Sequence, residues 1–229
     1  EAAWVTERIA SVRSRGRVAV LFRMNAQSRL FEEGLLRLRL PYLVLGGVGF
    51  YERKQVKDVL AYLRLVQNPR DAVAFRRVVN VPPRGIGTKT VEEIDRVAAA
   101  GGESPWEATG RLLDEAALPS RALTPLRQFR ETVETLRAEA GGHSLRLLIE
   151  RVLELSGYGA ALAREDTQES QDRLENLAEL LSAAADYESR EEAPSLAGFL
   201  DRAALVSETD RLRALPRIDH DHAGGQRHE

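Results

Sequence analysis

Residues 50–90 read FYERKQVKDVLAYLRLVQNPRDAVAFRRVVNVPPRGIGTKT and contain the clearest structural signals in the chain. Apolar residues recur at helical spacing between residues 56 and 66, which predicts a long helix that ends at residues 68–69. A second helix follows, and a turn then starts a third. The stretch has nine Lys and Arg against three acidic residues, although the whole chain has a net charge of −2. Such a local cationic excess is typical of a phosphate-binding surface.

The turn that follows the second helix is the most specific local signal. Pro82 and Pro83 cannot continue a helix, because proline lacks an N–H and restricts the residue before it. Gly85 and Gly87 permit a tight backbone turn, and we expect Gly87 at positive φ. Ile86, between the two glycines, is expected to pack inward and anchor the turn.

The start of the third helix is a candidate anion site. Thr88 is its expected N-cap. A helix start offers free N–H groups and the positive end of the helix dipole, and here Arg84 and Lys89 lie beside it in the sequence. The alternative is an ordinary connector, since a Gly-X-Gly turn between two packed helices is common.

The composition is that of a soluble globular protein. Of 229 residues, 43% are hydrophobic and 30% charged, and no apolar run approaches the roughly 20 residues of a membrane helix. We therefore expect no membrane partner and a cytoplasmic location. The absence of cysteine excludes disulfides and thiolate metal sites. Residues 216–229 hold three of the four histidines without an apolar period, so we expect a disordered tail and no specific metal site.

The order of patterns along the chain predicts a mainly α fold with a partial α/β segment at the N-terminus. Helices are expected at residues 2–14 and 25–39, and short buried strands at residues 17–22 and 42–45. Two strands are too few for a sheet, so other strands would have to complete it. After residue 90 we expect helices at 104–116, 120–140, 143–156, 169–190 and 194–205. Residues 161–215 hold 13 acids against six Arg, which argues against a DNA-binding face there.

Several stretches resemble one protein family. Residues 18–29, VAVLFRMNAQSR, resemble motif IV of the UvrD/Rep/PcrA DNA helicases of superfamily 1. The chain also resembles the segment that follows this motif in the family, at residues 46–58, 61–65, 68–69 and 77–87. The sequence RLENL at residues 173–177 is similar to the family as well. In that family the second motor domain is RecA-like and contains a helical insertion, the 2B subdomain. The resemblance implies that residues 1–81 are the first part of the RecA-like motor domain, residues 82–215 the helical insertion, and residues 216–229 a tail.

The resemblance also implies roles for individual residues. Phe22 would stack on the base of ATP, and Arg23 would reach the γ-phosphate as the catalytic arginine of a complete enzyme. An arginine offers a fixed, always-charged fork that suits this task. The turn at residues 85–88 would grip the backbone of duplex DNA. Arg53 and Lys57 fall in a segment associated with the single-strand path.

The family's other ATP-binding motifs do not occur in this sequence. It has no Walker A motif and no Asp-Glu metal motif, so we expect a fragment or truncated product without ATPase activity of its own. The parent would be a 3′-to-5′ DNA helicase used in DNA repair, with ATP and Mg²⁺ as cofactors. Its partners would be DNA at a single-strand/duplex junction and the remainder of the motor. The alternatives are a free-standing, non-catalytic DNA-binding module and a helical protein-interaction module.

Overall fold

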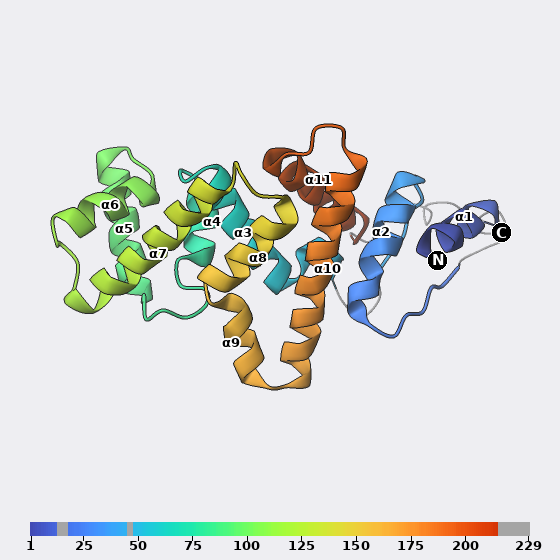
Figure 1. Ribbon diagram of the computed structural model, residues 1–229, viewed down its shortest axis with the longest axis horizontal. Helices are drawn as coiled ribbons and strands as arrows, with labels where there is room; N and C mark the ends of the chain where they lie inside the picture. Colours follow the sequence, from blue (N-terminus) through green and yellow to red (C-terminus); the bar gives the residue numbers. More distant parts are fainter. Residues whose placement is uncertain (13–17, 45–47, 215–229) are drawn as a thin grey trace, which may run out of the picture.

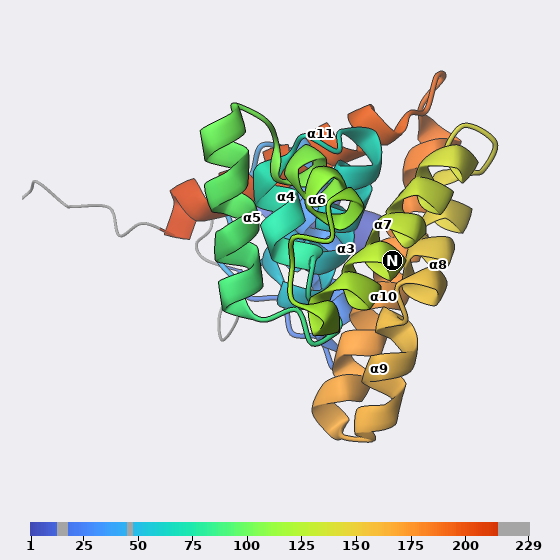
Figure 2. The ribbon, with the colours of Figure 1, turned by 90° about the vertical axis from the view of Figure 1, so that its left-hand side faces the viewer.

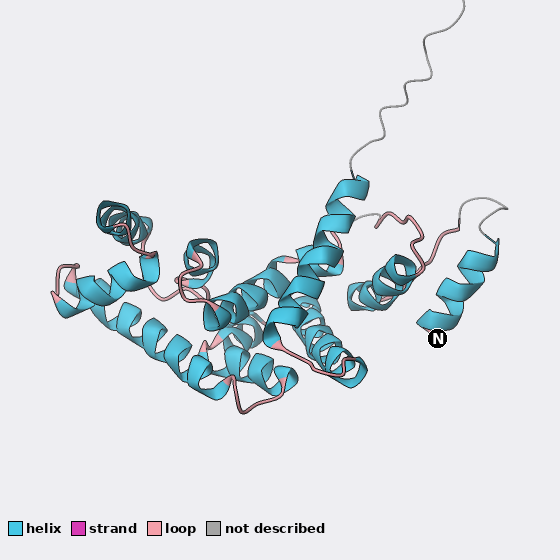
Figure 3. Cartoon of the chain, turned by 90° about the horizontal axis from the view of Figure 1, so that it is seen from above, coloured by secondary structure: helices cyan, strands magenta, loops and turns pink. Residues whose placement is uncertain are grey.

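A computed structural model describes residues 1–12, 18–44 and 48–214, and every regular element in these ranges is helical (Figure 3). The predicted mainly α fold is confirmed. The α-helices are α1 (Ala2–Val12), α2 (Ser28–Arg37), α3 (Lys54–Gln67), α4 (Ala72–Val78), α5 (Thr88–Gly101), α6 (Pro105–Asp114), α7 (Ser120–Glu139), α8 (Leu145–Leu155), α9 (Tyr158–Glu165), α10 (Gln168–Arg190) and α11 (Leu196–Ala214). The 3-10 turns η2 (Asn25–Gln27) and η3 (Phe50–Glu52) precede α2 and α3.

The two predicted strands are not formed. Residues 18–22 and 42–44, the described parts of those segments, are irregular. Their apolar side chains are open to solvent: Leu21 is 95% exposed and Leu43 is 62% exposed. A β-strand satisfies its N–H and C=O groups only through a neighbouring strand, and the described chain pairs none with these segments. The α/β prediction is therefore wrong for the strands, whereas the helices expected between and after them are present.

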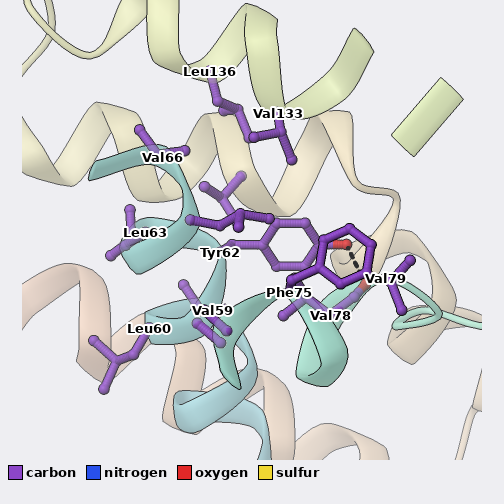
Figure 4. Packing of buried hydrophobic residues seen from close by; sticks show 14 of the residues in the cluster. Val59, Leu60, Tyr62, Leu63, Val66, Phe75, Val78, Val79, Val133 and Leu136 are labelled. Carbon is purple, nitrogen blue, oxygen red and sulfur yellow. Dashed lines mark hydrogen bonds between the residues drawn. The ribbon is translucent and has the colours of Figure 1, made fainter. Parts of the chain in front are cut away.

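Helix α3 lies at the centre of the molecule. Helices α4, α7, α8, α10 and α11 all pack against it (Figure 1), and ten of its fourteen residues are buried. Tyr62 reaches from α3 towards α4, where its hydroxyl lies 3.4 Å from the carbonyl oxygen of Val78 (Figure 4). The Phe129 ring of α7 meets Tyr62 and Phe75 edge-on, at centroid distances of 6.4 and 5.8 Å. Aromatic pairs in this geometry stabilise a core beyond the area that they bury.

The hydrophobic core runs without interruption from Phe50 to Val206. It therefore crosses residue 82, where the resemblance places a boundary between two domains. Ile86 and Ile94, which follow that position, lie in the same cluster as Val59 of α3. Packing thus joins the long helix of residues 50–67 to the later helices and gives residues 50–206 one shared interior.

The helices divide the molecule into a central body and two ends. Helices α5 and α6 pack together at one end, and α1 and α2 pack together at the other (Figure 1). Helix α9 and the first turns of α10 lie side by side and project from the body (Figure 2). Helix α9 was not predicted, because its eight residues are too few to establish a helical period. No described helix has both the length and the apolar composition that crossing a membrane requires.

Candidate nucleic-acid interface

The turn between α4 and α5 is held by one asparagine side chain. Asn80 Oδ1 accepts hydrogen bonds from the backbone N–H of Arg84, at 2.7 Å, and of Ile86, at 3.2 Å. Ile86 is 1% exposed and packs into the core, which confirms the predicted anchor. The backbone between these two bonded residues is tightly curved, with Gly85 at φ +78°.

Helix α5 begins one residue earlier than expected. Gly87 takes the N-cap position with φ −78° and ψ 164°, and Thr88 is the first helical residue, so the predicted Thr88 cap is wrong. The predicted positive φ at Gly87 is also wrong, because Gly85 makes the sharp bend. A Cβ atom at either glycine would meet nothing within 4 Å, so the backbone here is open to an approaching ligand.

The exposed backbone of the turn retains hydrogen-bond donors. The N–H groups of Thr90 and Val91 donate to the carbonyl oxygen of Gly87, which closes the first turn of α5. Thr88 and Lys89 come too early in the helix for an intrahelical acceptor, and nothing else in the described chain accepts from their N–H groups. The Lys89 side chain is exposed and forms no ion pair within the described residues. These groups can together hold an anion.

Arg84, by contrast, is directed into the protein. Its Nη1 donates to the carbonyl oxygens of Val78 (3.2 Å) and Pro82 (3.1 Å), and its Nη2 donates to Tyr62 Oη (2.5 Å) and to the carbonyl oxygen of Ser156 (3.2 Å). The guanidinium also lies over the Phe129 ring, 5.5 Å from its centroid. Four hydrogen bonds and two cation–π contacts, to Phe129 and Tyr62, occupy this cation within the fold.

Several other cations of the basic stretch have internal partners as well. Arg53 donates to Asn176 and Ser28, and burial lowers the pKa of its guanidinium despite the nearby carboxylates. Lys57 forms an ion pair with Glu52. The +6 excess counted in the sequence is therefore partly compensated within the fold, as three further ion pairs illustrate: Arg70–Glu107, Arg76–Asp95 and Arg77–Asp58.

Phe22 and Arg23 precede α2, whereas the turn precedes α5, and these helices lie towards opposite ends of the molecule (Figure 1). The Phe22 ring stacks on Phe31, with centroids 6.2 Å apart. Arg23 is exposed and lines an open cleft of roughly 500 Å³ whose other charged residues are Asp172 and Glu175. Two carboxylates make the cleft itself unsuited to a polyphosphate. The structure thus places the predicted ATP contacts apart from the predicted duplex contacts of the turn, whereas Arg53 donates to Ser28 at the start of α2.

Asn80 is a residue of the candidate site that the sequence analysis did not single out. Its signal was present, because asparagine side chains often accept hydrogen bonds from backbone N–H groups a few residues ahead in a turn. The position of Asn80, two residues before Pro82-Pro83 and four before Arg84, fits that pattern.

Residues 1–101 match the family described as the UvrD-like helicase C-terminal domain. Most of the chain is also similar to the ATP-dependent DNA helicase PcrA of Bacillus subtilis, with 39% identity over 217 residues, which cover 93% of this chain and 29% of PcrA. The chain belongs to the UvrD/PcrA-type helicase family. Its identity to DNA helicase II of Escherichia coli is 39% over 212 residues, or 90% of this chain and 29% of that protein. Its identity to PcrA of Staphylococcus aureus (strain Mu50) is 37% over 195 residues, which cover 84% of this chain and 27% of that protein.

This UvrD/PcrA-type chain spans 29% of the length of the Bacillus subtilis PcrA and of the Escherichia coli DNA helicase II that it matches. The matched residues 1–101 include both the segment with Phe22 and Arg23 and the turn before α5. Both predicted contact regions therefore lie in the part of the chain that is similar to the helicase domain.

Proposed function

We propose that this chain is part of an ATP-dependent DNA helicase, in which the turn at residues 85–89 holds the phosphate backbone of duplex DNA beside the junction with single-stranded DNA. The observation that carries the proposal is the open start of α5, where the Thr88 and Lys89 N–H groups and the Lys89 ammonium have no acceptor in the described chain. Membership of the helicase family supports DNA as the source of the anion.

Binding of this kind has a defined signature. Backbone N–H groups and one ammonium contact phosphates and read no base edges, so the affinity should be independent of sequence. Each phosphate neutralised by a cation adds about −0.9 to the slope of log K against log salt for B-form DNA. The proposal therefore predicts weak duplex binding that falls with salt.

The test compares two single-charge variants of the same helix. Lys89→Ala removes the free ammonium, whereas Arg96→Ala removes a charge that is paired with Glu93. We expect Lys89→Ala to flatten the salt slope of duplex binding, measured by fluorescence anisotropy, by about 1, and Arg96→Ala to leave it near the parent value. Equal slopes for the parent and Lys89→Ala would show that the turn is only a helix connector.

The remaining roles are proposed on the family resemblance. Phe22 and Arg23 would contact ATP and its γ-phosphate in the complete enzyme, with Mg²⁺, outside the acidic cleft that Arg23 lines. Arg53 and Lys57 would each exchange a present partner for a phosphate if they line the single-strand path. Translocation in the 3′-to-5′ direction, use in DNA repair and a cytoplasmic location belong to the same proposal.

A further inference from the structure

We propose that Asn80 and Arg84 are positioning residues that hold the turn before α5 in its DNA-binding shape, and that neither touches DNA. This inference rests on the proposed duplex grip of residues 85–89. It assigns a role to Asn80, and it moves Arg84 from the set of predicted DNA contacts to the interior of the turn.

Asn80 holds the turn through two hydrogen bonds to one side-chain oxygen. One carboxamide oxygen accepts from the N–H groups of Arg84 and Ile86, and these bonds fix the backbone on both sides of Gly85. The two N–H groups are thereby withdrawn from any external ligand. The donors of the turn that have no acceptor in the described chain are then the N–H of Gly85 and those that follow Ile86, at the start of α5. Asn80 thus determines which N–H groups of the turn are available.

The Arg84 guanidinium connects the turn to the helices around it. It links Tyr62 of α3, the carbonyl oxygens of Val78 and Pro82 and the carbonyl oxygen of Ser156 that follows α8. A planar fork can serve several acceptors at once, which an ammonium cannot do with the same geometry. To reach a phosphate, Arg84 would have to leave these acceptors unsatisfied in a half-buried site, which is costly.

The Tyr62 hydroxyl extends this network from Arg84 to the backbone before Pro82. A tyrosine hydroxyl is protonated at neutral pH, and burial, partly offset by Arg84, raises the pKa of Tyr62 further, to about 12. The hydroxyl can therefore accept from Arg84 Nη2 and donate to the carbonyl oxygen of Val81 at the same time. Asn80, Arg84 and Tyr62 form one connected network under the turn.

The unaltered chain provides the first test, by amide hydrogen exchange with and without duplex DNA. We expect the N–H groups of Arg84 and Ile86 to be protected without DNA and to change little when DNA is added. Those of Thr88 and Lys89 should be less protected and should slow on binding. Faster exchange at Ile86 than at Thr88 in the free chain would overturn the inference.

Substitutions provide the second test, with the salt slope as the readout that separates positioning from contact. Asn80→Ala removes no charge, so we expect duplex affinity to fall on the order of tenfold with an unchanged slope. Arg84→Lys keeps the positive charge but loses the planar guanidinium that serves several acceptors. It should therefore bind duplex DNA as weakly as Arg84→Ala does. If Arg84→Ala flattens the slope by about 1 and Arg84→Lys restores both slope and affinity, Arg84 is a DNA contact and the inference fails.

The failure of this inference is distinguishable from that of the proposed function. If Asn80→Ala binds like the parent while Lys89→Ala flattens the slope, the turn grips DNA without the positioning network, and only the inference is overturned. If Lys89→Ala has no effect, the duplex grip itself is overturned. Circular dichroism of each variant shows whether the helices are retained, and the exchange experiment decides the matter if Asn80→Ala does not fold.

Discussion

Arg29 of α2 and Asp186 of α10 lie 157 positions apart in the sequence, and their side chains form an ion pair of 3.0 Å. The Arg29 side chain is only 2% exposed, and its guanidinium also pairs with Glu179 of α10 and Glu33 of α2. Burial alone would lower the pKa of Arg29, but the three carboxylates raise it overall. This cluster is a principal link between the N-terminal segment and the long helix α10.

We expect Arg29→Ala to lower the free energy of unfolding by about 3 kcal/mol, because removing one partner of a buried ionic cluster leaves carboxylates with an uncompensated charge. The matched control is Arg146→Ala, which breaks an exposed pair with Glu150 and should cost less than about 1 kcal/mol. Urea unfolding monitored by circular dichroism measures both. Equal losses for the two variants would contradict a structural role for the cluster.

Gly34 of α2 lies against Thr6 of α1, and a Cβ atom at Gly34 would come within 2.9 Å of Thr6 Cγ2. Thr6 is fully buried, so the side chain has little room to move. We expect Gly34→Ala to destabilise the α1–α2 contact by roughly 1–3 kcal/mol. Thr6→Ala removes the clashing atoms, so the double variant should be more stable than the sum of the single effects predicts. Additive effects in a double-mutant cycle would refute the close contact.

The two glycines of the turn should respond differently to substitution. Gly85→Ala places a side chain at φ +78° and should cost about 1 kcal/mol of stability, because L-residues disfavour this region. Gly87 has φ −78°, so Gly87→Val should fold like the parent. Its branched side chain would nevertheless stand where the proposed phosphate approaches, and duplex binding should fall. Thermal unfolding of both variants tests the predicted stabilities. Fluorescence anisotropy with duplex DNA tests the predicted loss of binding.

Glu107 caps the start of α6 and should contribute a pH-dependent part of the stability. The backbone N–H and then the hydroxyl of Ser104 hold the pKa of Glu107 below its usual value, with a smaller contribution from Arg70. A carboxylate with a depressed pKa in the folded state stabilises the fold above its unfolded pKa, and the contribution disappears as the pH falls through the folded pKa.

The stability of the parent should therefore decline below about pH 4.5, and Glu107→Gln should reduce that decline. Glu131→Gln, at an exposed position of α7 without a hydrogen bond in the described chain, is the control and should follow the parent. Thermal unfolding at a series of pH values measures the effect. Parallel pH curves for the parent and Glu107→Gln would refute the role of this cap.

The proposed role of Arg23 can be tested in a complete enzyme that carries this segment. A group that acts on charge in the transition state typically contributes on the order of 10³ or more to the rate. We expect Arg23→Ala to lower kcat by that order while nucleotide affinity stays near the parent value. Equal losses in rate and affinity would make Arg23 a ground-state contact, and unchanged kinetics would exclude it from the chemistry.

Local patterns predicted the helices well. The apolar period of residues 56–66 correctly predicted α3, and Ser104-Pro105 correctly predicted the start of α6. In both cases the interactions that form the helix lie within a few residues of each other in the sequence. The strands at residues 18–22 and 42–44 failed because strand formation depends on a neighbour that the described chain does not provide.

The details of the turn were harder to predict. Arg84 was expected to face DNA, but two of its acceptors, Tyr62 and Ser156, lie 22 and 72 positions away. Nothing in the sequence near Arg84 indicates either of them. The single-residue error at Thr88 has a similar origin, because Asn80 and the buried Ile86 fix where the backbone enters the helix.

The central position of α3 has a consequence for synthesis on the ribosome. Helix α3 ends at Gln67, but α10, which covers part of it, begins only at Gln168. At about 5–20 residues per second, roughly 5–20 s pass before synthesis of α10 begins, and α11, the last helix to cover α3, begins later still at Leu196. During that interval the nascent chain displays a hydrophobic helix that a chaperone can recognise. Slow translation of the second half of the chain would lengthen this exposure.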